Sequence, residues 1–161
     1  MLDRLPAGTS LWIDTNIFLY HLFDTHPSCT RLFGRVRRRE LRGFTSATVL
    51  SEVLHKLMLA EVGERSPVMP AGALRTLRRH PEIIATLTKG PELLRQLPTW
   101  HVQIIPVRWH HVQAAADLAR RHHLMTTDAI IVATMRAVGL TAIATNDTDF
   151  LRVPGLTVWR P

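Results

Sequence analysis

Leu11-Trp12-Ile13-Asp14-Thr15-Asn16 and Ala142-Ile143-Ala144-Thr145-Asn146-Asp147-Thr148-Asp149-Phe150 are the two stretches that decide the fold. In each, an apolar, strand-like run stops at an acidic residue. If the two strands lie parallel in one sheet, their carboxylates project from the same edge, where open α/β sheets bind ligands. Carboxylates that converge on one edge repel one another, and a hard divalent cation between them is the ordinary way to relieve that repulsion.

Bulk composition limits the class of protein. The chain has 161 residues, enough for one domain with its own core, and 46% of them are hydrophobic, which argues against disorder. The single Cys29 can form neither an internal disulfide nor a zinc site, as is usual in a reducing compartment. The apolar run 11–23 is too short to span a bilayer and carries Asp14 and Asn16. We therefore expect a cytoplasmic protein without a membrane partner.

Positive charge is the second global feature. The formal net charge is +7 and the sequence pI is about 11.1, a balance that favours an acidic partner such as nucleic acid. The basic residues cluster in three segments, 35–42, 75–80 and 120–123. Solvated helix ends, where cations offset the helix dipole, are the alternative interpretation of each cluster taken alone.

Strand-like and helical segments alternate along the chain. Strands are expected at 11–13, 43–45, 102–107, 142–145 and 156–159. Helices are expected at 16–22, 27–39, 47–62, 111–122 and 127–138, with short helical pieces punctuated by prolines between 61 and 99. This alternation predicts the α/β class, with one central parallel sheet of about four to five strands and helices on both faces.

Two candidate site residues also have ordinary structural interpretations. Asp14 could simply cap the helix that follows it, which Asp does well. Glu52 lies on the helix expected at 47–62, roughly opposite its apolar stripe, and Lys56 follows one turn later. A surface Glu–Lys pair at this spacing contributes only a few tenths of a kcal/mol.

The remaining acidic residues can likewise be interpreted either as structural residues or as members of a site. Asp128 begins an apolar helix, where a negative charge complements the dipole. Asp147 and Asp149 follow a strand in a Thr-Asn-Asp-Thr-Asp sequence, which is typical of Asx-turns and helix starts. The complete set is more specific than any member, because four or five oxygen ligands without cysteine suit Mg²⁺ or Mn²⁺. A basic protein with an acidic, metal-binding cleft has the charge pattern of a nuclease.

The order of these motifs resembles that of the PIN-domain nucleases, and most closely the VapC type, the toxin half of bacterial toxin–antitoxin pairs. The motifs are Ile13-Asp14-Thr15-Asn16, Ser51-Glu52-Val53, Thr127-Asp128-Ala129 and Thr145-Asn146-Asp147-Thr148-Asp149-Phe150. The resemblance runs from Leu11 to about Trp159 and implies a single PIN-like domain over residues 1–161. It also implies an endoribonuclease that depends on Mg²⁺ or Mn²⁺ and leaves a 5′-phosphate and a 3′-hydroxyl.

The resemblance further implies roles for individual residues. Asp14, Glu52, Asp128 and Asp147 would be the catalytic, metal-binding carboxylates, and Asp149 an accessory metal ligand or a supporting group. Asn16 and Thr145 would orient carboxylates or bound water. Family members commonly form homodimers, and the toxins are silenced by a small DNA-binding antitoxin whose tail enters the active-site groove.

The segment 61–99 is longer than in a minimal toxin of this type. Its Arg75, Arg78 and Arg79 could contact RNA or the antitoxin, and its length keeps a housekeeping RNA-processing nuclease open as an alternative. A haloacid-dehalogenase-like phosphatase also places Asp after the first strand, but it normally has a second Asp where this chain has Asn16. A non-catalytic RNA-binding module is the third alternative, and the presence of all four carboxylates disfavours it.

Overall fold

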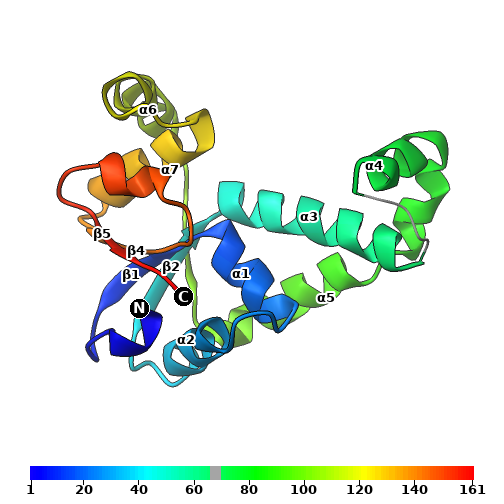
Figure 1. The fold of residues 1–161 in the computed structure, drawn as a ribbon, viewed down its shortest axis with the longest axis horizontal. Coiled ribbons are helices and arrows are strands. Elements are labelled where there is room, and N and C mark those ends of the chain that lie inside the picture. Colours follow the sequence, from blue (N-terminus) through cyan, green and yellow to red (C-terminus); the bar gives the residue numbers. More distant parts are fainter. Residues whose placement is uncertain (66–69) are drawn as a thin grey trace.

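The central sheet contains five parallel strands in the order β3-β2-β1-β4-β5, as Figure 1 shows. The computed structural model describes residues 1–65 and 70–161. The strands are β1 (Ser10–Ile13), β2 (Arg42–Ser46), β3 (Gln103–Ile105), β4 (Ala142–Ala144) and β5 (Thr157–Trp159). The predicted α/β class and parallel sheet are confirmed. The strand expected at 102–107 is shorter than predicted, because Pro106 has no N–H with which to continue the ladder.

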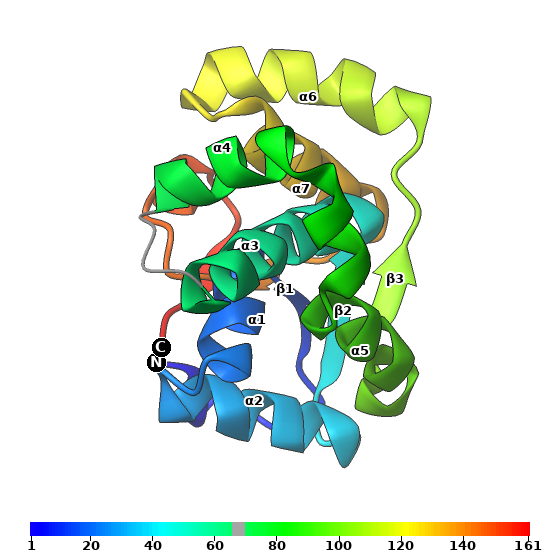
Figure 2. The ribbon, with the colours of Figure 1, turned by 90° about the vertical axis from the view of Figure 1, so that its right-hand side faces the viewer.

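Seven α-helices are found in the described part of the chain. They are α1 (Thr15–Leu22), α2 (Pro27–Arg37), α3 (Ala47–Arg65), α4 (Pro70–Arg79), α5 (Lys89–Gln96), α6 (Trp109–His122) and α7 (Thr126–Ala137). Short 3₁₀ turns occupy Leu2–Arg4, Pro81–Thr86, Leu97–Trp100 and Asp149–Arg152. Helices α6 and α7 lie on one side of the sheet, whereas α1, α2 and α5 lie on the other (Figures 1 and 2).

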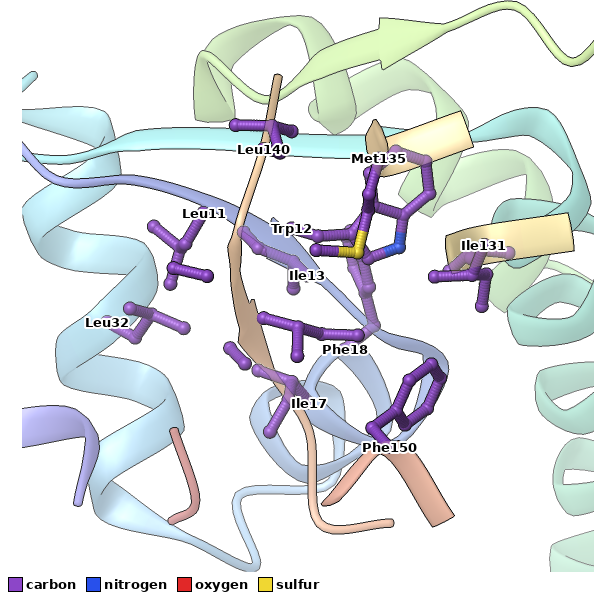
Figure 3. Close-up of a cluster of buried hydrophobic side chains, with 14 of the residues drawn as sticks. Leu11, Trp12, Ile13, Ile17, Phe18, Leu32, Ile131, Met135, Leu140 and Phe150 are labelled. Carbon is purple, nitrogen blue, oxygen red and sulfur yellow. The ribbon is translucent and has the colours of Figure 1, made fainter. Parts of the chain in front are cut away.

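Strand β1 is the centre of the core. Its Leu11, Trp12 and Ile13 are fully buried. Because side chains alternate along a strand, the two faces of β1 contact different helices. Figure 3 shows Leu11 directed toward Leu32 of α2, and Trp12 toward Met135 of α7. The same strand therefore fixes both helical layers, and it delivers Asp14 to the edge where the strand ends.

The ends of the chain meet beside the sheet, where the backbone N–H of Leu2 donates to the carbonyl of Arg160 at 2.9 Å (Figure 2). Gly43 in β2 allows a close approach between layers. A Cβ built there would lie 2.9 Å from Ile13 Cδ1 and 3.1 Å from Val36 Cγ1. A larger residue at this position would require the side chains of Ile13 and Val36 to shift.

Helix α3 extends from the sheet to a helical arm formed by α4, the 3₁₀ turn 81–86 and α5. Residues 66–69, within the segment 61–99 singled out above, lie outside the described part of the chain. The buried carboxylate of Glu61, only 3% exposed, accepts hydrogen bonds from the backbone N–H groups of Thr88 and Lys89 at 3.0 Å each. Arg65 also pairs with it. Glu61 thus satisfies the free N–H groups at the start of α5 and joins that helix to α3.

Across residues 1–65 and 70–161, no helix combines the length and the apolar character needed to cross a bilayer.

Candidate active site

Asp14 lies where β1 ends and α1 begins, and it is 6% exposed. Its Oδ1 accepts the backbone N–H of Thr15 at 2.7 Å, so it caps α1 as the structural interpretation expected. Its Oδ2 accepts hydrogen bonds from Asn16 Nδ2 at 2.8 Å and from Thr145 Oγ1 at 2.7 Å. Both carboxylate oxygens are therefore held in fixed positions by neighbouring donors.

The neighbouring strand β4 supplies the other half of this network. Its register with β1 pairs Ile13 with Ala144, so Thr145 follows directly beside Asp14. Asn16 Nδ2 also donates to Thr145 Oγ1 at 3.1 Å, and the backbone N–H of Asn146 donates to Asn16 Oδ1 at 3.0 Å. The two parallel strand ends are thus connected by side chains, as expected for a site built at this edge of the sheet.

Glu52 reaches the same edge from the second turn of α3. Thr15 Oγ1 donates to its Oε2 at 3.0 Å, and Lys56 Nζ lies 2.8 Å from its Oε1. The predicted Glu–Lys pair is therefore present. Partial burial raises the pKa of Glu52, but the hydrogen bonds and charge of Lys56, together with Thr15, outweigh it and leave the pKa below its ordinary value. Glu52 is consequently ionised at neutral pH.

Asp128 lies in the first turn of α7. Burial raises its pKa to about 6, and the negative charges of neighbouring acidic residues add to the shift; these are Asp147, Asp14, Asp149 and Glu52. Burial likewise raises the pKa of Asp14, with contributions from Glu52 and Asp147. Burial is the largest cause of both shifts, and the additional repulsion arises because the carboxylates lie near enough to one another to interact. The fold thus gathers all five predicted residues into what we call the carboxylate rim: Asp14, Glu52, Asp128, Asp147 and Asp149.

Asp147 and Asp149 are held by contacts within their own turn. Asp147 Oδ1 accepts the backbone N–H of Asp149 at 2.8 Å, forming the predicted Asx-type turn. The N–H of Asp147 itself donates to Thr145 Oγ1 at 2.9 Å. Asp149 pairs with Arg152 at 2.7 Å, so one of its oxygens already has a cationic partner.

The donor atoms of the rim suit Mg²⁺ or Mn²⁺, because every side chain contributes carboxylate oxygen and none contributes sulfur or imidazole. The clustered negative charge that raises the pKa of Asp128 is what a divalent cation would neutralise. Within residues 1–65 and 70–161, however, no three acidic, histidine or cysteine side chains are already grouped as ligands. Lys56 and Arg152 instead hold two of the carboxylates, so closure around an ion requires side-chain rearrangement.

The arginines Arg75, Arg78 and Arg79 are exposed on α4, at the end of α3 remote from the sheet (Figure 1). Helix α4 packs on α3 through a small apolar cluster that includes Val62 and Leu77. The rise of a helix places Val62 about 15 Å along α3 from Glu52. These arginines therefore do not touch the carboxylate rim.

Two residues that contact the rim had no site role in the sequence analysis. Thr15 holds Glu52, and the only sequence signal was its place between Asp14 and Asn16. Lys56 was recognised only as a surface partner of Glu52. The Glu52–Lys56 pair follows from the spacing of four residues along α3. The Thr15–Glu52 contact does not, because it depends on how α3 approaches α1.

Comparison with known proteins agrees with this architecture. The model of the family described as "PIN domain" matches residues 11–156. A curated relative, "Ribonuclease VapC2" of Methanocaldococcus jannaschii, is 26% identical over 148 residues, covering 92% of this chain and 91% of its own.

Solved structures share the fold at lower identity. VapBC2 of Rickettsia felis, bound to a DNA fragment from its promoter, superposes with a TM-score of 0.59 at 15% identity, covering 94% of this chain and 98% of its own. VapC20 of Mycobacterium tuberculosis, described as a sarcin–ricin loop cleaving toxin, gives 0.58 at 20% identity, covering 94% and 99%. These matches confirm the resemblance to VapC-type proteins, and the family match over residues 11–156 establishes that this chain belongs to the PIN-domain family.

Proposed function

We propose that this protein is a divalent-metal-dependent endoribonuclease that acts as the toxin of a toxin–antitoxin pair. The observation that carries the proposal is the carboxylate rim, where burial and four neighbouring negative charges raise the pKa of Asp128 to about 6. Carboxylates that repel one another in this way are stabilised by bound protons or by a bound cation. The names of the VapC relatives supply the substrate class, since one is called a ribonuclease and another cleaves the sarcin–ricin loop.

In this proposal Asp14, Glu52, Asp128 and Asp147 hold the metal, and Asp149 is an accessory ligand. Mg²⁺ or Mn²⁺ bound there would neutralise charge on the phosphodiester and make a coordinated water more acidic. Asn16 and Thr145 fix Asp14 through hydrogen bonds to its Oδ2, and Thr15 fixes Glu52. The chain's own contribution is thus to fix Asp14 and Glu52 through these hydrogen bonds, while the release of Glu52 from Lys56 and of Asp149 from Arg152 accompanies metal binding.

The cleavage test uses total cellular RNA incubated with Mg²⁺, Mn²⁺ or EDTA. We expect discrete fragments that require both the metal and Asp14, with 5′-phosphate and 3′-hydroxyl ends. Asp14→Asn is the inactive variant and Asp117→Asn, an exposed acidic change on α6, is its matched control. Folded protein with metal present that cuts no RNA, or Asp14→Asn protein that cuts as well as the wild type, would contradict the proposal.

A toxin role implies a cognate antitoxin, and the structural neighbours include VapBC toxin–antitoxin complexes. We therefore propose a small antitoxin partner and a homodimeric, cytoplasmic protein. Expression of the wild type alone should stop growth, while co-expression of the protein from an adjacent short reading frame should restore it. A housekeeping nuclease would instead leave growth unchanged when overproduced. VapC2 and VapC20 match over more than nine-tenths of both chains, so the length of the segment 61–99 gives little reason to prefer the housekeeping role.

A further inference from the structure

A second charged feature lies at the opposite end of the sheet, where β2 and β3 begin. It is a hollow of about 470 Å³ whose lining includes two arginines and a histidine, Arg39, Arg42 and His101. The remaining lining residues are Val36, Leu41, Val102 and Gln103. We call this feature the basic hollow. Nothing in the proposed nuclease chemistry uses it.

No carboxylate lines the basic hollow. Glu40 is the nearest acidic residue in the sequence, but its oxygens contact Arg35 at 3.3 Å and Arg38 at 2.6 Å instead. Within the described ranges 1–65 and 70–161, Arg39 and Arg42 form no ion pair. Two arginines without an acidic partner therefore face one concave space, and an anion would complete their charge and hydrogen bonding.

The backbone places these side chains at some cost. Arg39 follows α2 with a φ of 60°, and His101 follows the 3₁₀ turn 97–100 with a φ of 56°. Glycine adopts this left-handed region without penalty, whereas other residues adopt it at a cost of about 1 kcal/mol or more. Arginine and histidine thus occupy two positions that glycine would fill more easily, and both line the hollow. Beside it, Arg37 lies 4.9 Å from the ring centre of Trp100 and adds positive charge.

The hollow is too far from the carboxylate rim to bind the phosphate that is cut. Arg42 begins β2, and the strand runs four residues further to Ser46 at the opposite edge. At about 3.3 Å per residue the two ends are separated by at least about 13 Å. Arginine forms two parallel hydrogen bonds with a phosphate group and stays charged at every physiological pH.

We propose that the basic hollow binds a backbone phosphate of the RNA substrate, at a distance from the bond that is cleaved. The proposal rests on the proposed ribonuclease function. With a phosphate bound there, the preferred substrate is an RNA whose length or folding lets it contact both ends of the sheet. A dinucleotide would fill the rim alone and would gain nothing from Arg39 and Arg42.

Binding can be tested separately from cleavage by working in EDTA. The probe is a fluorescently labelled RNA hairpin, and its affinity is measured by anisotropy over a range of salt concentrations. The test variant is Arg39→Gln combined with Arg42→Gln. The control is Arg95→Gln combined with Arg136→Gln, which removes the same charge from exposed positions on α5 and α7.

We expect the test variant to bind the hairpin about tenfold more weakly. The slope of log affinity against log salt should fall by roughly 0.7 to 0.9, the value for one lost phosphate contact. The control should lose less than about threefold and keep most of the slope. Equal losses in the two variants would overturn the proposal, because the effect would then be one of net charge alone.

The source of the phosphate is tested with the His101 ring signals in NMR. Addition of the RNA hairpin should shift them, whereas inorganic phosphate at the same concentration should not. A response to inorganic phosphate without a response to RNA would overturn the RNA assignment and indicate a free-anion site. Failure of the nuclease itself would be seen independently, as absent cleavage with Mg²⁺ or Mn²⁺ despite normal binding in EDTA.

Discussion

The two ends of the central sheet carry opposite charge. At the carboxyl ends of β1 and β4, five acidic residues form the carboxylate rim, and burial together with mutual repulsion raises the pKa of Asp128 to about 6. At the amino ends of β2 and β3, Arg39 and Arg42 face a hollow without any acidic lining residue. The acidic end is suited to chemistry on a phosphate, and the basic end is suited to holding one.

This difference shows why the net charge of +7 does not contradict an acidic active site. In a parallel sheet the carboxyl ends of the strands lie apart from the amino ends. The negative charge needed for metal binding therefore does not cancel the positive charge needed for RNA binding. Each of the following changes alters one part of this arrangement and leaves the others intact.

The largest effect is expected from Asp14→Asn. The change keeps the shape of the side chain but removes the charge at the centre of the rim. We expect cleavage to fall by at least about 100-fold, since even residues that only support metal ligands cost 10–100-fold. Initial rates on a defined RNA, with circular dichroism to verify folding, measure the effect. The Asp117→Asn control should cleave normally, and a comparable loss there would contradict the assignment.

Asp128→Asn should relieve both the burial of a charge and the repulsion within the rim. Since the folded pKa of about 6 lies above the ordinary value of 3.8, the folded protein holds this proton more tightly than the unfolded chain does. The resulting stabilisation is complete below the ordinary value and is lost as pH rises through 6. In EDTA at neutral pH the variant should therefore be more stable than the wild type, by about 1–2 kcal/mol, because solvent screens the charge of this half-buried group.

Thermal melts at two pH values distinguish this explanation from a general packing effect. The melting temperature of Asp128→Asn protein should exceed that of the wild type by roughly 5 °C at neutral pH, and the difference should nearly disappear near pH 4. A variant that is less stable than the wild type at both pH values would show that the carboxylate stabilises the metal-free fold.

Glu61→Gln tests a buried carboxylate that faces donors rather than other acids. Burial raises its pKa, but the backbone N–H groups of Thr88 and Lys89, with the charge of Arg65, bring the pKa below its ordinary value. An amide NH₂ would be brought against those N–H groups, so we expect a loss of about 1–3 kcal/mol in the free energy of unfolding. Urea unfolding measures it. Glu64→Gln, whose exposed carboxylate contacts Lys89, should cost under about 0.5 kcal/mol; an equal cost would show that Glu61 has no special anchoring role.

The smallest effect is expected from Lys56→Gln. Its ammonium group holds Glu52 Oε1 in the absence of metal, and an exposed pair of this kind contributes only a few tenths of a kcal/mol to stability. Removing it should leave the melting temperature almost unchanged and tighten Mn²⁺ binding by a few-fold, because one competing cation is lost. Isothermal titration calorimetry decides the sign, and weaker Mn²⁺ binding would mean that Lys56 positions Glu52 for the ion.

The sheet and its acidic edge were predictable because each signal was local. Apolar runs ending at Asp14 and Asp147 predict strands and their carboxyl ends, and parallel pairing brings those ends together. The structure also shows why single residues were ambiguous: Asp14 caps α1 and Glu52 pairs with Lys56 while both belong to the rim. The ordinary structural roles and the proposed site roles are not exclusive.

The basic hollow could not be predicted in the same way. The sequence analysis identified the basic cluster 35–42 but not which of its arginines share a space. Glu40 neutralises Arg35 and Arg38 and leaves Arg39 and Arg42, a division that depends on the left-handed turn at Arg39. His101 joins them only because β3 pairs with β2 across nearly sixty residues of intervening chain. Long-range pairing of this kind leaves no periodic signal in the sequence.

The most direct test of the account measures binding and cleavage in the same two variants. RNA affinity is determined in EDTA, and the cleavage rate at saturating RNA is determined with Mn²⁺, for Asp14→Asn and for Arg39→Gln combined with Arg42→Gln. The account predicts that the first variant binds at least as tightly as the wild type but does not cut, while the second binds more weakly but cuts at a normal saturated rate. If both variants lost RNA affinity, or if both lost the saturated cleavage rate, the result would contradict separate roles for the two ends of the sheet.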